Sequence, residues 1–395
     1  MRIESLRLKN FKVFQDVEIG ELPPLCVFVG ANGSGKTTLF DLFGFLKHAL
    51  LNNVRSALQA RGGYKEVVSR GHEEEDITIE IKFRMPIVGV DRLVTYHLCI
   101  GDPVKPRVKR EILRYKRGAH GSPYHFLDFT DGKGYAITNE EDFHKTDEEL
   151  TREKKELGSP DILAIKGLGQ FREFKAASAF RHLIENWHVS DFHISDARGS
   201  KDAAGYSEHL SATGDNLQLV AQHILENHPK VFGEIVERMK RRVPGIVDVV
   251  PEPTLDGKLL LKFKDGSFKD PFVDRFVSDG TIKMFAYLVL LYDPAAHPLL
   301  CVEEPENQLY PTLLEELIEE FRLYAGRGGQ VMVSTHSPDF LNGARLEEVF
   351  WLAKQGGFTK IKRAGDDPQV AAYMADGDQM GFLWKQGFFE GASIE

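Results

Sequence analysis

The sequence predicts a layered α/β fold: a mixed β-sheet with flanking helices, and an α+β region inserted into its middle. Residues 25–29 and 299–302 are continuously apolar, as in strands that are buried on both faces of a sheet. A helix pattern follows each of them, and residues 330–334 form another apolar run near the end of the chain. Residues 101–270 combine short strands and helices without this order, which indicates an insertion.

The predicted elements divide the chain into three parts. Residues 1–100 form the N-terminal part of the layered domain, 101–270 the inserted region, and 271–395 the C-terminal part. Residues 140–157 are highly charged and are expected to form a solvated helix or a helical hairpin. Further helices are expected at 36–60, 171–187, 216–241, 280–292 and 312–325, and further strands at 1–24, 77–100 and 246–272.

Composition limits the class of protein. The chain has 395 residues, 42% hydrophobic and 28% charged, as in ordinary globular proteins. It lacks an apolar run of the roughly 18 residues that a spanning helix needs, and a signal peptide, so a cytoplasmic location without membrane contact is expected. The net charge of −9 disfavours a general coat for nucleic acid. Cys26, Cys99 and Cys301 lie far apart, which predicts buried thiols and neither disulfides nor a cysteine zinc site.

A glycine-rich loop carries the chemistry. Residues 30–37 fit the pattern G-x-x-x-x-G-K-[ST], in which glycines let successive backbone N–H groups surround a phosphate. Lys36 supplies a positive charge for the β- and γ-phosphates, and the Thr37 hydroxyl is a candidate Mg²⁺ ligand. The helix that begins here adds its positive dipole end. The candidate nucleotide-binding residues are Gly30, Asn32, Gly33, Ser34, Gly35, Lys36, Thr37 and Thr38.

A pair of acids ends the apolar strand at 299–302. Glu303 and Glu304 can place one carboxylate beside the Mg²⁺ of the glycine-rich loop and a second where it orients a water. The competing interpretation is the solvated start of a helix, since Pro305 follows. The presence of the loop favours the first interpretation.

Together these motifs resemble the ABC-type P-loop ATPase heads of the SMC and RecF group. Within that group the chain is similar to compact ATPases related to the overcoming lysogenization defect (OLD) proteins. Four runs carry the resemblance, in the order and spacing of the group: residues 6–12, 277–281, 303–311 and 334–338. The resemblance covers both ends of the chain, about 1–100 and 270–395, and says little about the middle.

The resemblance implies that two heads dimerise with two ATP molecules between them. Ser278 and Gly280 would then contact the γ-phosphate from the partner copy, at a helix start. Glu304 would polarise the attacking water, Glu303 would assist the metal, and His336 would sense the γ-phosphate. In the common form of this acidic motif the first acid is Asp, so the longer Glu303 suggests metal contact through water. The implied catalytic residues are Glu304, His336 and Lys36, and the implied cofactors are ATP and Mg²⁺.

Two further assignments follow from the same resemblance. Arg70 stands where related heads carry a phosphate-reaching arginine, and Gln170 is a candidate metal- and water-binding glutamine. A solvated loop residue is the competing interpretation of each. Tyr310 stands where relatives often have His, and no catalytic role is assigned to it.

A basic stretch at residues 105–117 has seven Lys or Arg residues and one acid, Glu111. Its alternation with apolar residues predicts an amphipathic strand whose cationic face could follow a phosphate backbone, with Tyr115 as a stacking ring. The alternative is an edge strand whose charges oppose aggregation. Near the end of the chain, Trp384, Phe388 and Phe389 predict either packing onto the ATPase core or an anchor for a partner.

Two functions remain after these arguments. One is the ATPase and sensor subunit of an antiphage or toxin-type system, which would control a separate nuclease or toxin. The other is a RecF-like DNA-binding repair or maintenance ATPase. The residues after His336 show no acidic cluster like that of a Toprim nuclease, so an effector is expected to be a separate partner. A transporter motor and a GTPase are disfavoured because their motifs are missing.

Overall fold

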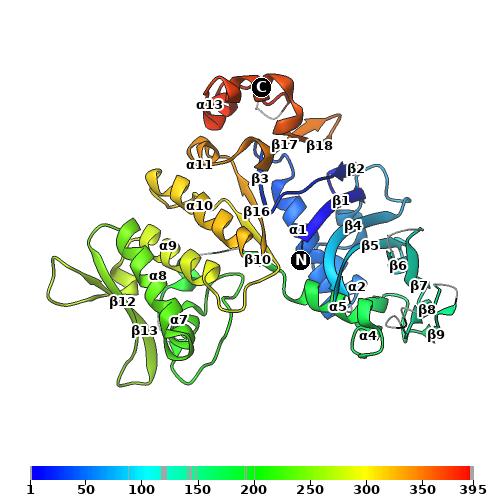
Figure 1. Ribbon diagram of the computed structural model, residues 1–395, viewed down its shortest axis with the longest axis horizontal. Helices are drawn as coiled ribbons and strands as arrows, with labels where there is room; N and C mark the ends of the chain where they lie inside the picture. Colours follow the sequence, from blue (N-terminus) through cyan, green and yellow to red (C-terminus); the bar gives the residue numbers. More distant parts are fainter. Residues whose placement is uncertain are drawn as a thin grey trace.

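The central element is a six-stranded sheet that carries the glycine-rich loop (Figure 1). The computed structural model describes residues 2–87, 89–116, 122–139, 142, 145–146, 149–190, 192, 194–199 and 201–391. The sheet order is β10 (His188–Ser190), β15 (Leu299–Glu303), β16 (Gln330–Thr335), β3 (Leu25–Val29), β17 (Val349–Gln355) and β18 (Phe358–Arg363). Its first five strands are parallel, and β18 returns antiparallel to β17.

A second, fully antiparallel sheet lies beside the first. Its order is β2 (Phe14–Ile19), β1 (Arg2–Phe11), β4 (Ile77–Ile87), β5 (Val90–Gly101), β6 (Arg107–Tyr115), β7 (Tyr124–Thr130), β8 (Lys133–Ile137) and β9 (Arg152–Glu156). Helix α1 (Lys36–Leu51) contributes to the same apolar core as both sheets. This double packing fixes the helix that follows the glycine-rich loop, and burial of its apolar side chains supplies the driving force.

A lobe lies at the other side of the central sheet and shares an apolar core with it (Figure 1). It contains β11 (Lys201–Asp202), β12 (Ile246–Pro253), β13 (Lys258–Asp265) and β14 (Phe272–Val273), with α7 (Leu217–Asn227) and α8 (Pro229–Arg242). Helix α9 (Asp279–Leu291) joins the lobe to the centre and is buried from Thr281 to its end, as its nearly uninterrupted apolar sequence requires.

Further helices complete the fold. They are α2 (Val54–Gln59), α3 (Tyr64–Val67), α4 (Ala164–Leu168), α5 (Lys175–Glu185), α6 (Ile194–Ala197), α10 (Thr312–Gly326), α11 (Pro338–Asn342), α12 (Pro368–Ala375) and α13 (Met380–Lys385). Single 3₁₀ turns cover Asp274–Phe276, Leu346–Glu348 and Ala364–Asp366.

The layered α/β architecture predicted from the sequence is confirmed, and its strands at 25–29, 299–302 and 330–334 are β3, β15 and β16. Two long helices are interrupted. The expected helix at 36–60 breaks because the Asn53 side chain accepts a hydrogen bond from the Ser56 N–H (2.7 Å) and starts α2. The expected helix at 216–241 breaks at His228, where Pro229 begins α8.

The inserted region does not form one unit. Strands β5 and β6 pair directly, so the antiparallel sheet continues across the expected boundary at residue 100. Strand β10 enters the central sheet beside β15, and β13 pairs with β14 across residue 270. The sequence becomes basic near residue 103 because one face of a strand is exposed to solvent there. This change in composition does not mark a domain boundary.

The charged segment at 140–157 also differs from expectation. Residues 152–156 form strand β9, which pairs with β8, and no helix lies there. The remainder falls partly outside the described residues, namely at 140, 141, 143, 144, 147 and 148. Alternating charges suited a solvated strand as well as a helix, and pairing with β8 decided between them.

The last helices pack onto the chain's own core. Phe389 is fully buried, with its ring 5.1 Å from that of Trp351 and 5.7 Å from that of Trp384. Phe388 lies 4.8 Å from the Tyr373 ring. The structure therefore supports self-packing of this tail over the alternative of a free anchor.

We expect Phe389→Ala to lower the free energy of unfolding by about 3–5 kcal/mol, because it opens a cavity beside Trp351 and Trp384. Phe382 is the matched control, since 48% of it is exposed and its truncation removes little contact. Urea denaturation of both variants measures the difference. Equal effects of the two substitutions would show that the tail is not docked.

Candidate functional site

The glycine-rich loop joins β3 to α1 and is fixed by its neighbours. Gly35 has φ +104°, and a Cβ there would lie 2.8 Å from Val13 Cγ2, so only glycine fits. The Thr359 hydroxyl, near the start of β18, donates to the Ser34 carbonyl (2.7 Å). The C-terminal hairpin β17–β18 therefore holds the loop in place.

Lys36 lies inside the loop. Its Nζ donates to the carbonyls of Gly30 (2.7 Å) and Ala31 (3.2 Å), and burial lowers its pKa. The buried Ser34 Oγ has no hydrogen-bond partner among the described residues. An ammonium enclosed by the loop, next to an unused hydroxyl, fits a phosphate group of a nucleotide.

Thr37 and Glu303 meet at the edge of the central sheet. The Thr37 hydroxyl donates to Glu303 Oε2 over 2.7 Å, although 266 residues separate them. The contact forms because β3 and β15 are parallel strands of one sheet, so their carboxyl ends lie at the same edge. A hydroxyl and a carboxylate at this distance are oxygen ligands of the type Mg²⁺ takes. The structure thus brings together two of the three residues that the sequence proposes for the metal, and Gln170 is not among them.

Glu304 follows in a rare backbone conformation. Its φ of +42° is left-handed, and its N–H donates to the Ser334 carbonyl (2.9 Å). The side chain accepts a hydrogen bond from Asn307 Nδ2 (3.0 Å) and lies 3.3 Å from His336 Nδ1. Strained conformations concentrate at functional sites, and this one turns the carboxylate toward His336.

Glu306 organises the segment that carries His336, a role that the sequence analysis missed. Its Oε1 accepts hydrogen bonds from the Thr335 hydroxyl (2.7 Å) and the His336 N–H (3.1 Å). The carboxylate is buried, so these bonds are shielded from water. The sequence did contain a signal for Glu306, because this residue lies within the run 303–311 that resembles the ATPase heads.

A pocket of about 1070 Å³ opens beside this edge. Thr37, Thr38, Glu303 and Glu304 line it, together with cations and an acid that the sequence analysis missed: Lys12, Arg61, Lys283 and Asp41. The pocket therefore presents charges of both signs next to the glycine-rich loop, as a site for a metal-bound polyphosphate requires.

Ion pairs and hydrogen bonds fix the charged side chains that line the pocket. Asp41 pairs with Lys12 (2.6 Å) and Arg61 (2.7 Å); burial opposes its ionisation, but these partners hold its pKa below its usual value. Lys283 Nζ donates to the Asn307 carbonyl (2.8 Å), and burial lowers its pKa to about 8. A lone lysine within the apolar helix α9 was the available signal for Lys283.

Ser278 and Gly280 lie outside this pocket. Ser278 caps α9, because its hydroxyl accepts a hydrogen bond from the Thr281 N–H (3.2 Å). Ser278 and Gly280 line a second pocket of about 600 Å³, whose wall shares Gln308 with the first. One chain therefore holds Thr37, at the end of the glycine-rich loop, and Ser278 at different pockets.

The structure does not bring Arg70 or Gln170 to the main pocket. Arg70 Nη2 donates to Glu66 Oε2 (2.6 Å) on the surface, and Gln170 Nε2 donates to the Lys166 carbonyl (3.4 Å). Arg61 is the loop arginine that reaches the pocket. The two arginines follow similar short helices, and the tertiary path of the chain separates them.

The basic strand differs from both interpretations of it. Strand β6 is internal, because it pairs with β5 and β7. Tyr115 is buried and its ring stacks on Phe126 at 3.8 Å, so it is no free stacking ring. Acids pair with the cations: Lys109 with Asp76 (2.7 Å), Arg110 with Asp128 (3.0 Å) and Arg114 with Glu80 (3.5 Å).

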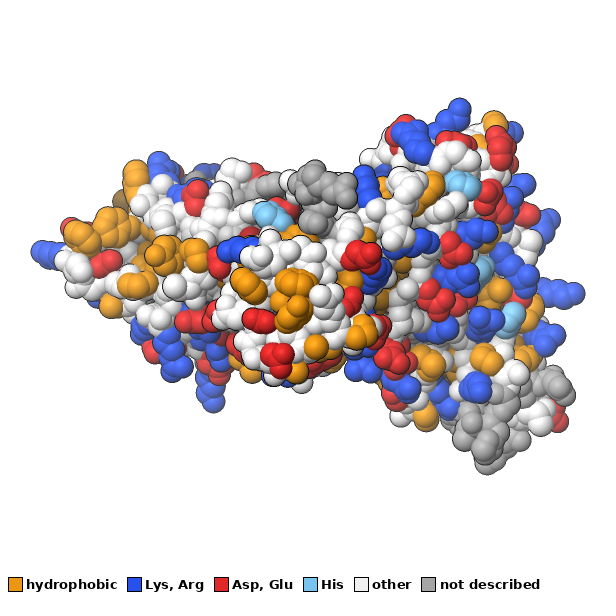
Figure 2. Space-filling model, turned by 90° about the horizontal axis from the view of Figure 1, so that it is seen from above, with side chains coloured by type: hydrophobic (Ala, Val, Ile, Leu, Met, Phe, Trp, Pro, Cys, Tyr) orange, Lys and Arg blue, Asp and Glu red, His pale blue; other side chains and the backbone are white. Residues whose placement is uncertain are grey.

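The surface view agrees with this pairing. Figure 2 shows Lys and Arg side chains interspersed with Asp and Glu on the part of the molecule at the right. Interspersed acids reduce the counterion release that would drive binding to a phosphate backbone. Arg117, the last cation of the basic stretch, lies outside the described residues.

Within the part of the chain that the structure describes, we find no helix long and apolar enough to cross a bilayer.

The fold is that of an ABC-type P-loop ATPase head. The chain is similar to the SMC head bound to the C-winged helix domain of ScpA, with a TM-score of 0.55, 14% identity, and coverage of 92% of this chain and 97% of that one. A second neighbour is the Smc head domain with an extended coiled coil, bound to the C-terminal domain of ScpA derived from Pyrococcus furiosus. Its TM-score is 0.52 at 14% identity, covering 95% of this chain and 98% of that one.

Sequence comparison gives the family. The protein-family model described as "AAA domain, putative AbiEii toxin, Type IV TA system" matches residues 130–342, which is more than half of the chain. The chain therefore belongs to this family. The model described as "AAA ATPase domain" matches residues 1–185. A "DNA replication and repair protein RecF" of Corynebacterium jeikeium is 34% identical over 64 residues, which are 16% of this chain and 15% of that protein. The chain thus matches only a small part of this curated relative.

We expect the paired cations of β6 to add little to DNA binding. Removing Lys109 and Arg114 together should change the affinity for duplex DNA at low salt by less than about twofold, because Asp76 and Glu80 already neutralise them. The matched variant Asp76→Asn with Glu80→Gln should bind DNA more tightly. Fluorescence anisotropy at several salt concentrations measures both. A strong, salt-dependent loss on removing the cations would assign DNA binding to β6.

Proposed function

We propose that this chain is an ATP-hydrolysing switch that dimerises with two ATP–Mg²⁺ between its copies. The placement of Thr37 and Ser278 at different pockets carries the proposal, because the serine would then meet a phosphate on the loop of another copy. Ser278 and Gly280 would contribute the N-terminal end of α9, where N–H groups and the helix dipole favour an anion.

Within one half-site the chain's residues have distinct tasks. Lys36 would exchange the carbonyls of its own loop for the β- and γ-phosphates, and Thr37 with Glu303 would hold Mg²⁺. Bound Mg²⁺ neutralises developing charge on the phosphates. Glu304 would accept a proton from the attacking water, held in position by Asn307. His336 lies 3.3 Å from Glu304 and would report on the γ-phosphate through this contact.

The biological role that we propose is the ATPase and sensor subunit of an antiphage or toxin-type system with a separate effector. Support comes from the family, whose description includes a putative AbiEii toxin and a type IV toxin–antitoxin system. Both SMC-head neighbours are described as bound to a partner protein, which fits a head that acts on another subunit. Purification of the native protein with whatever accompanies it tests this role: an effector should elute with the ATP-bound form.

A RecF-like DNA-binding ATPase is the second candidate, and the local match to RecF favours it. The neutralised face of β6 speaks against DNA contact there. DNA that stimulates ATP turnover, with no protein partner retained, would select this role over the first.

We expect Glu304→Gln to lower ATP turnover at least about 100-fold while ATP binding persists, because the amide keeps the shape but cannot accept the proton. The ATP-bound variant should accumulate as a dimer. Phosphate release and light scattering after size exclusion measure the two effects. Glu315→Gln, on the exposed face of α10, is the matched control and should behave as wild type. Unchanged turnover in Glu304→Gln would remove Glu304 as the base.

Composite sites predict complementation between two inactive chains. A mixture of Lys36→Ala and Ser278→Arg should regain part of the activity that both parents lack, because each heterodimer keeps one intact site. A mixture of Lys36→Ala with the double variant Lys36→Ala, Ser278→Arg keeps none and should stay inactive. ATP hydrolysis during titration of one chain into the other measures the recovery. Failure with proven heterodimers would place Ser278 outside the site.

A further inference from the structure

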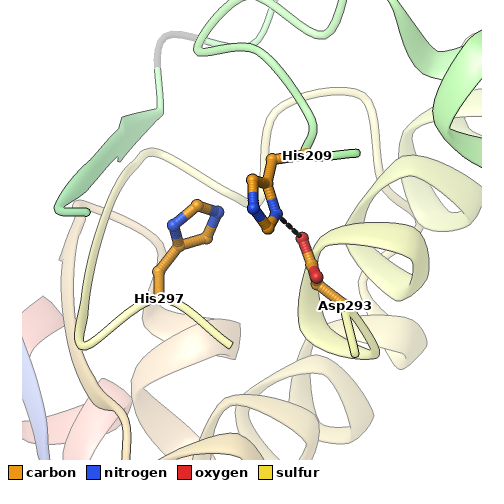
Figure 3. Close-up of side chains that lie close together, drawn as sticks. All are labelled: His209, Asp293 and His297. Atoms are coloured by element: carbon orange, nitrogen blue, oxygen red, sulfur yellow. Dashed lines mark hydrogen bonds and ion pairs between the residues drawn. The ribbon is translucent and has the colours of Figure 1, made fainter. Parts of the chain in front are cut away.

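A cluster of two histidines and an aspartate lies at the opposite edge of the central sheet from the glycine-rich loop. Asp293 follows the end of α9, His297 precedes the start of β15, and His209 lies on the segment that leads into α7 (Figure 3). Asp293 and His297 belong to the same turn, and His209, 84 residues before Asp293, brings its side chain to the same point. The ATPase site uses none of these residues.

The geometry suits a metal ion. Each side chain offers one ligand atom, and these atoms all lie within 4.8 Å of one another. His209 Nδ1 contacts Asp293 Oδ2 at 2.7 Å, as Figure 3 shows, and the other oxygen of Asp293 accepts the Ala295 N–H (2.8 Å). That second bond orients the carboxylate, in the way that outer hydrogen bonds orient metal ligands.

His297 provides an independent indication of a ligand. It is 8% exposed, and its Nδ1 lies 3.0 Å from the Asn186 carbonyl, to which only a protonated nitrogen can donate. In the neutral ring the proton on Nδ1 leaves a lone pair on Nε2, which is buried and has no hydrogen-bond partner among the described residues. A buried nitrogen of this kind costs stability unless something binds it.

We propose that His209, Asp293 and His297 bind one divalent transition-metal ion, and that this ion is Zn²⁺. Two imidazoles and one carboxylate are a ligand set that suits Zn²⁺, whereas Mg²⁺ prefers oxygen ligands alone. Tetrahedral bonds of about 2.0–2.1 Å place ligand atoms about 3.3 Å apart, so the wider separations must shrink and the 2.7 Å contact of His209 with Asp293 must open. His209 can supply this movement, because its side chain is 38% exposed on a loop.

The surroundings leave room for a fourth ligand. His209 and His297 line a pocket of about 450 Å³, which Arg327 and Gly328 border on another side. Three protein ligands with one open position are a common zinc arrangement, in which water completes the tetrahedron.

The position of the site suggests its effect. Zn²⁺ would connect the segment before α7, in the lobe, with the turn between α9 and β15. Helix α9 carries Ser278 at its start and β15 carries Glu303 at its end, so both elements run from this site to the nucleotide edge. The ion would fix the lobe against the central sheet and raise the thermal stability of the fold.

The test uses the full-length protein with a tag that contains no histidine, since polyhistidine binds Zn²⁺. Inductively coupled plasma mass spectrometry should find about one Zn²⁺ per chain after gel filtration. A strong chelator should lower the Tm, and adding back Zn²⁺, but not Mg²⁺, should restore it by mass action. His209→Ala should bind Zn²⁺ at least about 10-fold more weakly and lose the Zn²⁺-dependent shift in Tm.

His223→Ala is the matched control, because His223 lies on α7 outside the cluster and should keep wild-type zinc content. Asp293→Asn should lose Zn²⁺ as His209→Ala does. A wild-type protein that neither retains Zn²⁺ nor shows a Zn²⁺-dependent Tm overturns the proposal and leaves a histidine–aspartate ion pair. Equal zinc binding by His209→Ala and wild type overturns it as well.

Discussion

The parallel register of β3, β16 and β15 is the constraint on which the site depends. Glu303 lies opposite Ser334, and Thr335 lies opposite Val29, so three carboxyl ends stop at the same level of the sheet. The glycine-rich loop follows the end of β3, the acid pair lies at the end of β15, and His336 follows the end of β16. A shift of one residue in either pairing would turn the side chains to the other face and separate Thr37 from Glu303.

Packing on both sides of α1 gives this edge its rigidity. The helix shares its apolar core with the antiparallel sheet and the central sheet, so the loop before it has little freedom to move. Thr359 adds a hydrogen bond to the loop from β18. The tail packs on Trp351 in the other apolar core, on the opposite side of the central sheet from α1.

Helix α9 links the two edges of the central sheet. Its start carries Ser278, its middle carries Lys283 beside the acid pair, and its end leads into Asp293. A buried helix of this length moves as a unit, because its side chains are close-packed on every side. Whatever fixes its far end therefore also sets the position of the serine that a partner copy would meet.

Local patterns in the sequence determined the elements that are buried on both faces. Continuous apolar runs gave β3, β15 and β16, and glycine spacing gave the loop, because burial and backbone freedom leave a trace in neighbouring residues. Short strands left no such trace: β10 has three residues, and only its partner β15 makes it a strand. The hairpin β17–β18 was missed for a different reason: residues 349–353 are as continuously apolar as β3, but no helix pattern or motif next to them marked the run as a strand.

The residues of the site also fall into two groups, those that local sequence patterns predict and those that only the tertiary structure reveals. Lys36, Thr37, Glu303, Glu304 and His336 were predictable because each lies in a motif at the end of a predicted strand or in the loop that follows it. Tertiary structure decided that Arg61 reaches the pocket while Arg70 does not, that acids neutralise the cations of β6, and that His209, Asp293 and His297 meet. Charge pairing and ligand geometry depend on distances of a few ångströms between segments far apart in the chain, and no local pattern records such distances.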